Sequence, residues 1–382
     1  RVATMPRMKR IFLDTASGTS PNPASLHQEG VAAKKILDQA RQEVAAVLMA
    51  QSDEIIFTSG GTEGNNLAIL GLPKGEVVVS VIEHPSALEA AALREKLGYG
   101  QVLLVPVNNE GVIKLETLAK LISPTTAVVS VMYANNEVGT IEPIVEVAKL
   151  VRAIRKKFNQ AQPYLHVDAC QAPRFLSLDV RKLGVDLMTI NSGKIYGPRG
   201  IGALFVKRGV PLEPILIGGG QEGGLRAGTE NHLLARDFAK FLVLANKRKD
   251  KESKNLIKLR DYFIKLVLRS IPQASLNGGL VNRLPNNVNL SFVGVSGEQV
   301  VLELDAKGIA ASTGSACSIP KHDSSYVILA LGKSKSEAKS AIRLTFPRDL
   351  TKTQIDYTLQ TLKSIISNLR KNNHAYSAEL AL

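Results

Sequence analysis

The stretch VDLMTINSGKIYGPRG, residues 185–200, places a lysine directly behind an apolar run. Its first six residues have the apolar and β-branched character of a buried strand, and polar residues and glycines come after them. A single lysine in a glycine-rich turn is usually a solvated surface residue. A larger role for Lys194 therefore depends on the residue types that stand at the ends of the other strands of the chain.

Short apolar runs alternate with amphipathic helical patterns over the first 250 residues. The expected strands are residues 55–58, 77–82, 102–107, 127–132, 165–167, 187–190 and 203–206. The expected helices include residues 86–97, 115–122 and 144–158. Strands that are apolar throughout and alternate with helices predict an α/β fold, with a mainly parallel, seven-stranded sheet sandwiched by helices.

A second region begins at a charged segment, residues 246–255, whose helix extends to about Ser270. The pattern then predicts strands at 287–293 and 341–346 and helices at 298–307 and 352–371. These elements indicate a smaller α+β domain. We expect a large domain over residues 21–250 and a small domain made of residues 1–20 and 251–382.

The composition is ordinary for a globular protein, with 45% hydrophobic and 21% charged residues. No apolar run reaches the roughly 18 residues that a membrane helix needs, and the basic N-terminal segment lacks the apolar core of a secretory signal. Two cysteines, Cys170 and Cys317, exclude a disulfide scaffold and fit a reducing compartment. We expect a cytoplasmic protein that does not bind a membrane.

The net charge of +14 raises the question of a nucleic-acid partner. However, the basic residues are spread along the chain, and the aromatic residues, 5% of the total, are not interleaved with them. The charge therefore favours a docking surface for an acidic protein over direct binding of nucleic acid.

The turn after residues 55–58 reads SGGTEG and opens a helical pattern. Free N–H groups at a helix N-terminus bind phosphate, so Gly61 and Thr62 are candidate phosphate ligands. No Gly-Lys-Ser/Thr comes next, which excludes a Walker A loop. A plain strand–helix turn is the alternative.

Four further expected strands also end in polar or titratable residues. These are His84 after residues 77–82, Asn135 and Asn136 after 127–132, Asp168 and Gln171 after 165–167, and Lys194 after 187–190. Helix caps and an Asx turn are the alternative interpretations. Because ligands bind at the carboxyl ends of parallel strands, the set together suits pyridoxal phosphate, which needs a phosphate cup, a stacking group, an acid and a lysine. We expect no bound metal.

Two loops complete the pattern. Residues 218–223, GGGQEG, match G-x-G-x-x-G formally, but no apolar helix comes after them, so we interpret them as a flexible loop that approaches a ligand or a partner subunit. Residues 312–318, STGSACS, place Cys317 among small polar residues, which favours an exposed thiol that is accessible for chemistry; a small buried hydrophobic residue is the alternative. Cys170 is expected to be structural.

These residues together resemble the cysteine desulfurases, fold-type I pyridoxal-phosphate enzymes of the class V aminotransferase group. The resemblance extends from about Phe12 to Arg348. It is carried by TSGGTE (58–63), EH (83–84), NNEVG (135–139), HVDACQ (166–171), KIYGP (194–198), RAGT (226–229) and GSAC (314–317). The GSAC loop resembles that of the subgroup serving iron–sulfur cluster assembly and tRNA thiolation.

The resemblance implies a role for each matching residue. Lys194 would bind the cofactor covalently, His84 would stack on its ring and help to move protons, and Cys317 would be the nucleophile. Further contacts to the cofactor would come from Gly61, Thr62 and Ser192 at the phosphate, Asp168 at the ring nitrogen, Gln171 at the ring hydroxyl, Asn136, and Thr229 of the other subunit of a homodimer. Asn136 and Arg343 would bind the substrate carboxylate.

The implied activity converts L-cysteine to L-alanine, with the sulfur passed to Cys317 as a persulfide and then to an iron–sulfur scaffold or tRNA-thiolation protein. One alternative is another fold-type I enzyme, a lyase or an aminotransferase; the cysteine in the GSAC loop argues against it. The other is a non-catalytic binding protein, against which the intact Lys194 and Asp168 argue.

Two positions depart from the family pattern. The family usually has Ser-x-His-Lys, whereas Gly193 stands here at the histidine position and Asn191 at the serine position. Either a side-chain contact near the phosphate is missing, or Ser192 and backbone N–H groups replace it.

Overall fold

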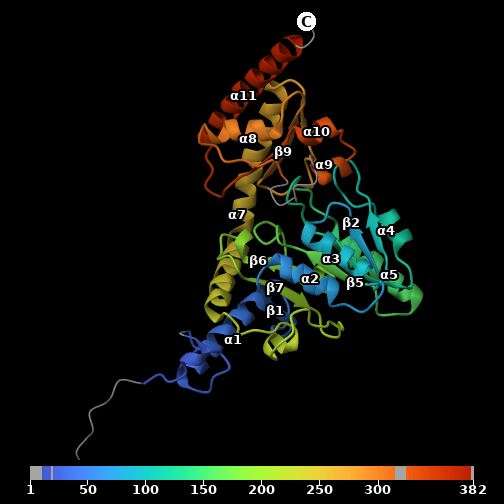
Figure 1. Cartoon of the computed structure of the whole chain (residues 1–382), viewed down its shortest axis with the longest axis vertical. Coiled ribbons are helices and arrows are strands. Elements are labelled where there is room, and N and C mark those ends of the chain that lie inside the picture. Colours follow the sequence, from blue (N-terminus) through green and yellow to red (C-terminus); the bar gives the residue numbers. More distant parts are fainter. Residues whose placement is uncertain (1–10, 19, 315–323, 380–382) are drawn as a thin grey trace, which may run out of the picture.

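The computed structural model describes residues 11–18, 20–314 and 324–379. The chain forms a large unit around a seven-stranded sheet and a smaller unit around a three-stranded sheet (Figure 1). One long helix, α7 (His232–Ser270), passes from the first unit into the second.

The sheet of the large unit has the strand order β1-β7-β6-β5-β4-β2-β3. Its strands are β1 (Ile55–Thr58), β2 (Glu76–Ser80), β3 (Val102–Val105), β4 (Thr126–Ser130), β5 (Tyr164–Asp168), β6 (Leu187–Asn191) and β7 (Gly202–Val206). Only β7 runs antiparallel to its neighbours, β1 and β6. The predicted α/β fold with a mainly parallel seven-stranded sheet is confirmed.

Helices cover both faces of this sheet. They are α1 (Gln28–Leu48), α2 (Gly61–Leu70), α3 (Pro85–Lys96), α4 (Leu115–Leu121), α5 (Ile144–Phe158) and the short α6 (Val180–Leu183). Successive strand residues point to opposite faces: Val77 and Val79 pack with α2 and α3, whereas Val78 packs with α1, α4, α5 and the first half of α7. Both faces of the sheet are buried by helices, which is why the strands are apolar throughout.

The carboxyl ends of β1, β2, β4, β5 and β6 share one edge of the sheet, because β7 alone is reversed. Each of the five polar turns singled out in the sequence begins at the last residue of one of these strands or within five residues of its end. The topology therefore gathers the candidate residues on one side of the large unit.

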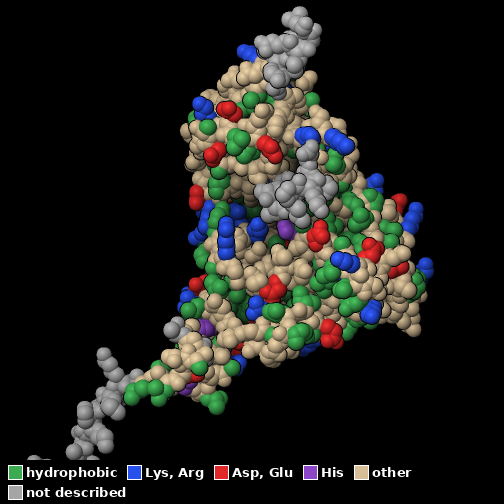
Figure 2. All heavy atoms as spheres, in the orientation of Figure 1, with side chains coloured by type: hydrophobic (Ala, Val, Ile, Leu, Met, Phe, Trp, Pro, Cys, Tyr) green, Lys and Arg blue, Asp and Glu red, His purple; other side chains and the backbone are tan. Residues whose placement is uncertain are grey.

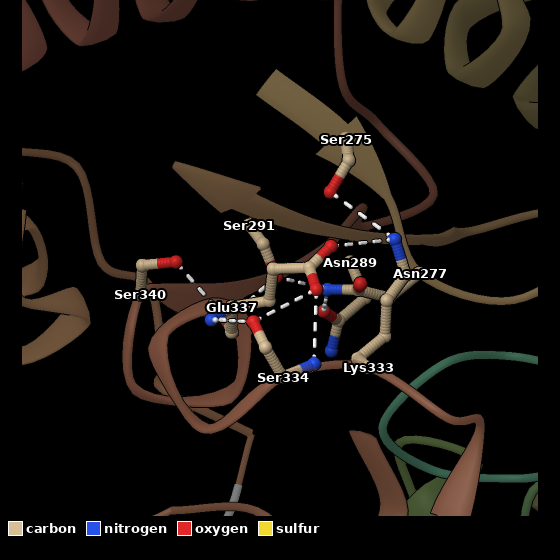
Figure 3. A network of polar contacts seen from close by, with 8 residues as sticks. All are labelled: Ser275, Asn277, Asn289, Ser291, Lys333, Ser334, Glu337 and Ser340. Atoms are coloured by element: carbon tan, nitrogen blue, oxygen red, sulfur yellow. Dashed lines mark hydrogen bonds and ion pairs between the residues drawn. The ribbon is translucent and has the colours of Figure 1, made fainter. Parts of the chain in front are cut away.

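The small unit is an α+β layer. Its strands are β8 (Ala274–Leu276), β9 (Asn287–Phe292) and β10 (Ala341–Thr345), and its helices are α8 (Gly297–Asp305), α9 (Tyr326–Ala330), α10 (Lys335–Lys339) and α11 (Lys352–Glu379). The sheet packs on the second half of α7 and on α8 and α11 through residues such as Phe263, Leu290 and Leu362. A polar network centred on Glu337 ties the start of α10 to β8 and β9 (Figure 3).

Two expectations about organisation need correction. Residues 11–18 do not join the small unit: Phe12 packs edge-on against His27 with ring centroids 5.3 Å apart, and Figure 1 shows this segment beside α1, at the far end from α11. The charged segment 246–255 also begins no new element, because it lies inside α7. Its charged residues form the middle of a helix that each unit covers only in part.

Glu222 anchors the glycine-rich loop at residues 218–224. This carboxylate is buried and accepts hydrogen bonds from both terminal nitrogens of Arg41, at 2.6 and 2.8 Å, and from Phe57 N at 2.9 Å. Arg226 binds Glu63 of α2 at 2.9 Å. The loop is thus held against α1, β1 and the start of α2.

Candidate active site

A cavity of about 560 Å³ lies between the two units, at the carboxyl edge of the large sheet. The large unit supplies Gly61, Thr62, Asn65, His84, Asn136, Asp168, Gln171 and Lys194, and the small unit supplies Asn287, Tyr326, Arg343 and Thr345. Figure 2 shows Lys and Arg side chains and a histidine gathered at a hollow in the middle of this face. Most of the predicted site residues therefore meet in one place.

The N-terminus of α2 forms one end of the cavity, with Gly61 and Thr62 in its wall. Gly60 has φ +151°, which favours glycine, and a Cβ on Gly61 would stand 2.7 Å from Cys170 Sγ. The side-chain nitrogen of Asn191 lies 3.6 Å from that Cβ position. Backbone N–H groups and an amide side chain thus converge where an anion fits.

His84 ends the turn after β2 and caps α3, its Nδ1 accepting from Ser86 N at 3.1 Å. The ring lines the cavity. Burial lowers the pKa of His84, Asp168 opposes this shift, and Lys194 adds to it. His84 therefore caps α3 and lines the cavity at the same time.

Asp168 is buried at the end of β5, and its carboxylate is held from two sides. Asn65 Nδ2 donates to Oδ2 at 2.7 Å, and Cys170 N donates to Oδ1 at 2.9 Å. Burial, reinforced by Asp168, raises the pKa of the Cys170 thiol, which fits the structural role expected for this residue.

Lys194 ends a 3₁₀ turn, Ser192–Lys194, directly behind β6. Asn191 begins this turn, its Oδ1 accepting from Gly193 N at 3.1 Å. The lysine side chain lines the cavity together with Asn191 and Gly193. The apolar strand and polar turn in the sequence thus place the amine beside His84 and Asp168.

The two adjacent amides after β4 have different roles. Asn135 is buried and forms the Asx turn, its Oδ1 accepting from Glu137 N and Val138 N. Asn136 lines the cavity, and its carbonyl accepts from Arg343 Nη1 at 3.2 Å. Arg343, on β10, also donates to Gly314 O at 3.2 Å, which fixes a guanidinium at the wall contributed by the small unit.

Two predicted residues lie elsewhere, and a third is outside the described residues. Ser192 is fully buried and lines no part of the cavity; its Oγ would lie 2.2 Å from a Cβ on Gly197. Thr229 is exposed and also absent from the cavity wall. Cys317 lies outside the described residues, although Gly314, three positions before it, lines the cavity.

Several buried polar residues near the site were not singled out from the sequence. Asn65 and Ser86 bind each other and connect His84 with Asp168. His166, two residues before Asp168, bonds Ser130 and Thr189 on the neighbouring strands, and burial lowers its pKa to about 4. Their residue types carry no signal of their own, because each partner lies at least 21 positions away except in the Ser86–His84 pair.

Buried acids also lie behind the cavity. Glu142 accepts from Ile113 N at 2.9 Å, and burial raises the pKa of its carboxyl group to about 8. Burial likewise raises the pKa of Glu83 well above its ordinary value, with Asp168 and Glu142 adding to the shift. Glu142 therefore holds a proton at neutral pH and adds little negative charge to the site.

The arrangement fits pyridoxal phosphate. Gly61, at which an added Cβ would collide with Cys170, leaves backbone room for a phosphate at a helix N-terminus, while a carboxyl group, an imidazole and an amine line the same cavity. Within the described ranges, no group of three or more His, Cys, Asp or Glu side chains is placed to hold a metal ion. No helix in those ranges combines the length and apolarity needed to cross a bilayer.

Comparison with known proteins agrees with this geometry. The sequence profile of the family described as aminotransferase class-V matches residues 6–358. A cysteine desulfurase IscS of Dictyoglomus turgidum is 42% identical over 91% of this chain and 88% of its own length. A cysteine desulfurase IscS 1 of Archaeoglobus fulgidus is 41% identical over 93% of this chain and 92% of its own.

Solved structures give the same result. One described as a NifS-like protein superimposes with a TM-score of 0.83 at 32% identity, covering 92% of this chain and 93% of that one. A NifS-like protein from Rickettsia africae superimposes with a TM-score of 0.81 at 29% identity, covering 91% and 92%. The similarity extends over both units.

Proposed function

The chain belongs to the class-V aminotransferase family, and we propose on that premise that it is a pyridoxal-phosphate-dependent cysteine desulfurase, which converts L-cysteine to L-alanine. The observation that carries this proposal is the meeting of Lys194, His84, Asp168 and Arg343 in one cavity between the two units. The relatives named above, which are cysteine desulfurases, support the choice of substrate.

The proposed cofactor contacts are drawn from the cavity wall. Gly61 and Thr62 hold the phosphate, with Asn191 beside them, and Lys194 is the covalent anchor. His84 stacks on the ring, Gln171 binds its hydroxyl group, and Asp168 keeps a proton on its nitrogen. When bound, pyridoxal phosphate supplies an electron sink for the charge left by bond breaking at the substrate.

The protein side chains bind the substrate and transfer its α-proton. Arg343 and Asn136 bind the substrate carboxylate, since a guanidinium held against the Asn136 carbonyl presents its other donors to the cavity. The amine of Lys194 accepts the proton from the substrate α-carbon. Both Arg343 and Lys194 line the same cavity, which supports this division of roles.

Sulfur transfer is assigned to Cys317. Its thiolate forms an S–S bond to the substrate sulfur, and the Cβ–S bond breaks with its electron pair going to the three-carbon fragment. This fragment is protonated and leaves as alanine, and Cys317 keeps the sulfur as a persulfide. An acceptor protein for iron–sulfur cluster assembly or tRNA thiolation then receives the sulfur.

The proposal extends to assembly and location. A homodimer is supported by Thr229, an expected cofactor ligand that is exposed and away from the cavity of its own chain, and by exposed apolar residues such as Leu26 and Ile217. We assign residues 21–250 to a large domain and residues 251–382 to a small one, with α7 shared between them. We place the protein in the cytoplasm, because a chain with only two cysteines fits a reducing compartment.

The test is product analysis with the purified, cofactor-loaded protein. Incubation with L-cysteine and a reductant should give sulfide and alanine in equal amounts, and Cys317→Ser should keep the yellow colour of the bound cofactor but lose both products. Sulfide accompanied by pyruvate and ammonia would show a lyase instead. A yellow protein that releases no product would contradict the proposal and favour a binding protein.

A further inference from the structure

A chain of hydrogen bonds connects His84 and Asp168, two of the residues proposed to contact the cofactor ring. His84 Nδ1 lies 2.8 Å from Ser86 Oγ, Ser86 Oγ lies 2.8 Å from Asn65 Nδ2, and the same Nδ2 lies 2.7 Å from Asp168 Oδ2. Asn65, Ser86 and Asp168 are all buried. Solvent therefore does not compete for these bonds.

The amide of Asn65 has one orientation that satisfies this chain. Asp168 is an acceptor, so the atom 2.7 Å from its Oδ2 is the side-chain nitrogen. The opposite orientation would place a carbonyl oxygen against a carboxylate. In the orientation present, both hydrogens of Nδ2 are used, one toward Asp168 and one toward Ser86.

The orientation of Asn65 also sets the direction of the next bond. Ser86 Oγ accepts from Asn65, so its own hydrogen is directed at His84 Nδ1. His84 Nδ1 also accepts from Ser86 N at 3.1 Å, where it caps α3. A ring nitrogen that accepts from two donors carries no proton.

We infer that His84 is fixed as the Nε2–H tautomer and serves the cavity as a hydrogen-bond donor rather than as a base, with Asn65 and Ser86 as the residues that position its proton. Nε2–H has no lone pair free for a proton, and a proton on Nδ1 would break the cap of α3. The lowered pKa of His84, which results mainly from burial, agrees with a neutral ring.

A fixed Nε2–H tautomer gives His84 and Lys194 different roles in proton transfer. The tautomer itself does not depend on the proposed function, but these roles rest on the proposed function: Lys194 is the base that moves the α-proton, and His84 donates a hydrogen bond from Nε2. Asn65 acts on both His84 and Asp168, because its Nδ2 donates one hydrogen bond to Ser86 Oγ and another to Asp168 Oδ2. Asn65 and Ser86 are positioning residues, since they act through His84 and Asp168.

The tautomer can be measured directly in the cofactor-loaded protein with ¹⁵N-labelled histidine rings. The chain has six histidines, and the His84→Asn spectrum assigns the signals of His84. We expect one protonated and one unprotonated ring nitrogen, with the proton on Nε2, between about pH 6.5 and 9. A proton on Nδ1, or averaging between the two tautomers, would overturn the inference.

Ser86→Ala removes one of the two donors to Nδ1. The variant should show a mixture of tautomers, and the acid limb of its sulfide-release profile should move to higher pH, because the ring then binds a second proton more readily. Ser334→Ala is the matched control: Ser334 caps α10 in the same way, accepting from Glu337 N at 3.2 Å, and lies in the network of Figure 3, apart from the cavity wall.

The outcomes separate the two proposals. A control variant with the parent's His84 signals and a Ser86→Ala variant with mixed signals support the positioning role, and unchanged signals in Ser86→Ala contradict it. If the parent shows the Nε2–H tautomer but makes no alanine, the proposed function fails and the tautomer stands. If it makes alanine with a proton on Nδ1, the reverse holds.

Discussion

At the scale of single residues, the two glycines around Lys194 have opposite surroundings. A Cβ on Gly193 would have Arg199 Cγ and Asn191 Oδ1 as its nearest atoms, both at 3.7 Å, an ordinary van der Waals distance. A Cβ on Gly197 would stand 2.2 Å from Ser192 Oγ. Gly197 is therefore required by close packing, whereas Gly193 fills a position that can accept a side chain.

We expect Gly193→His to tighten the binding of pyridoxal phosphate. The backbone of residue 193 is outside the left-handed region and has space, so a ring N–H can add a hydrogen bond near the phosphate. One such bond is worth about 0.5–1.5 kcal/mol, or roughly a two- to tenfold lower dissociation constant. Titration of the apoprotein measures it, with Gly193→Ala as the control that adds bulk without a donor. Equal or weaker binding by the histidine variant would count against it.

A second residue-scale prediction concerns Glu142 and pH. Its carboxyl group has a pKa of about 8 in the folded protein, against an ordinary value of 4.5, so between these values the folded state keeps a proton that the unfolded state has lost. The free energy of unfolding must then fall as pH rises through this window, by up to about 1.4 kcal/mol per pH unit. Glu142→Gln, which is neutral at every pH, should remove this contribution.

Denaturant unfolding at pH 5, 6, 7 and 8 tests this prediction. The stability of Glu142→Gln relative to the parent should increase steadily with pH, and taking the difference cancels other groups such as His166. Glu146→Gln, on the exposed side of α5, should give a difference that does not change with pH. Parallel curves for the parent and Glu142→Gln would show that Glu142 is ionised in the folded protein.

At the scale of elements, the start of α2 shows how one glycine lets a helix approach a strand end. Gly61 is the first residue of α2, and Cys170 comes after β5, so their contact sets how closely the phosphate end approaches the carboxylate of Asp168. Gly64, one turn later, faces Thr189 of β6 in the same way, with a Cβ position 2.6 Å from its Cγ2. The absence of side chains at Gly61 and Gly64 therefore allows α2 to pack closely against the sheet.

We expect Gly61→Ala to weaken cofactor binding because its Cβ would collide with Cys170 Sγ at 2.7 Å. The double variant Gly61→Ala with Cys170→Ala should recover much of the loss, since the sulfur is then gone. Dissociation constants of the two single variants and the double variant give the interaction energy, which should be favourable and above about 0.5 kcal/mol. Additive effects would mean that the helix, not the contact, is disturbed.

The sequence was most informative where an element is periodic and fully buried. β1 and α5 have the expected bounds, residues 55–58 and 144–158, because the apolar run of β1 stops at Ser59 and the amphipathic pattern of α5 lies between Pro143 and Asn159. Helix α1 was not expected, although its buried residues, among them Ala33, Leu37, Ala40 and Val44, recur at intervals of three and four. That periodicity was present in the sequence and would have identified the helix.

The site was predictable at strand ends and not beyond them. Lys194, His84 and Asp168 were found because parallel topology alone brings strand ends together. Ser192 is absent from the cavity wall because adjacent residues in a 3₁₀ turn point in different directions, and Asn191 lines the cavity instead. Asn65 could not be found, since its partner Asp168 lies 103 positions away and an asparagine on a helix is an ordinary residue.

At the scale of the whole molecule, α7 belongs to both units. Its first half contributes Phe238 and Leu242 to the core of the large unit, and its second half contributes Phe263 and Val267 to the core of the small one. Near the middle, Glu252 pairs with Arg174, whose guanidinium lines the cavity. Because one continuous helix packs in both cores, α7 couples the position of the small unit to that of the large unit.

We expect Lys254→Pro to uncouple the two units. Lys254 is exposed in the middle of α7, so the substitution removes little packing, but a proline inside a helix costs about 3 kcal/mol and breaks its continuity. Calorimetry should show one unfolding transition for the parent and for the control Lys254→Ala, and two for the proline variant. A single transition in all three proteins would mean that contacts across the cavity, not α7, couple the units.

The strand order has a further consequence during synthesis on the ribosome. β1 forms one edge of the large sheet and pairs only with β7, whose first residue is made about 140 positions later. At a translation rate of roughly 5–20 residues per second, its apolar residues wait about 7–30 seconds for a partner. During that interval Ile55, Ile56 and Phe57 are a target for chaperones or for another nascent chain. The first strand to be made is thus among the last to be paired.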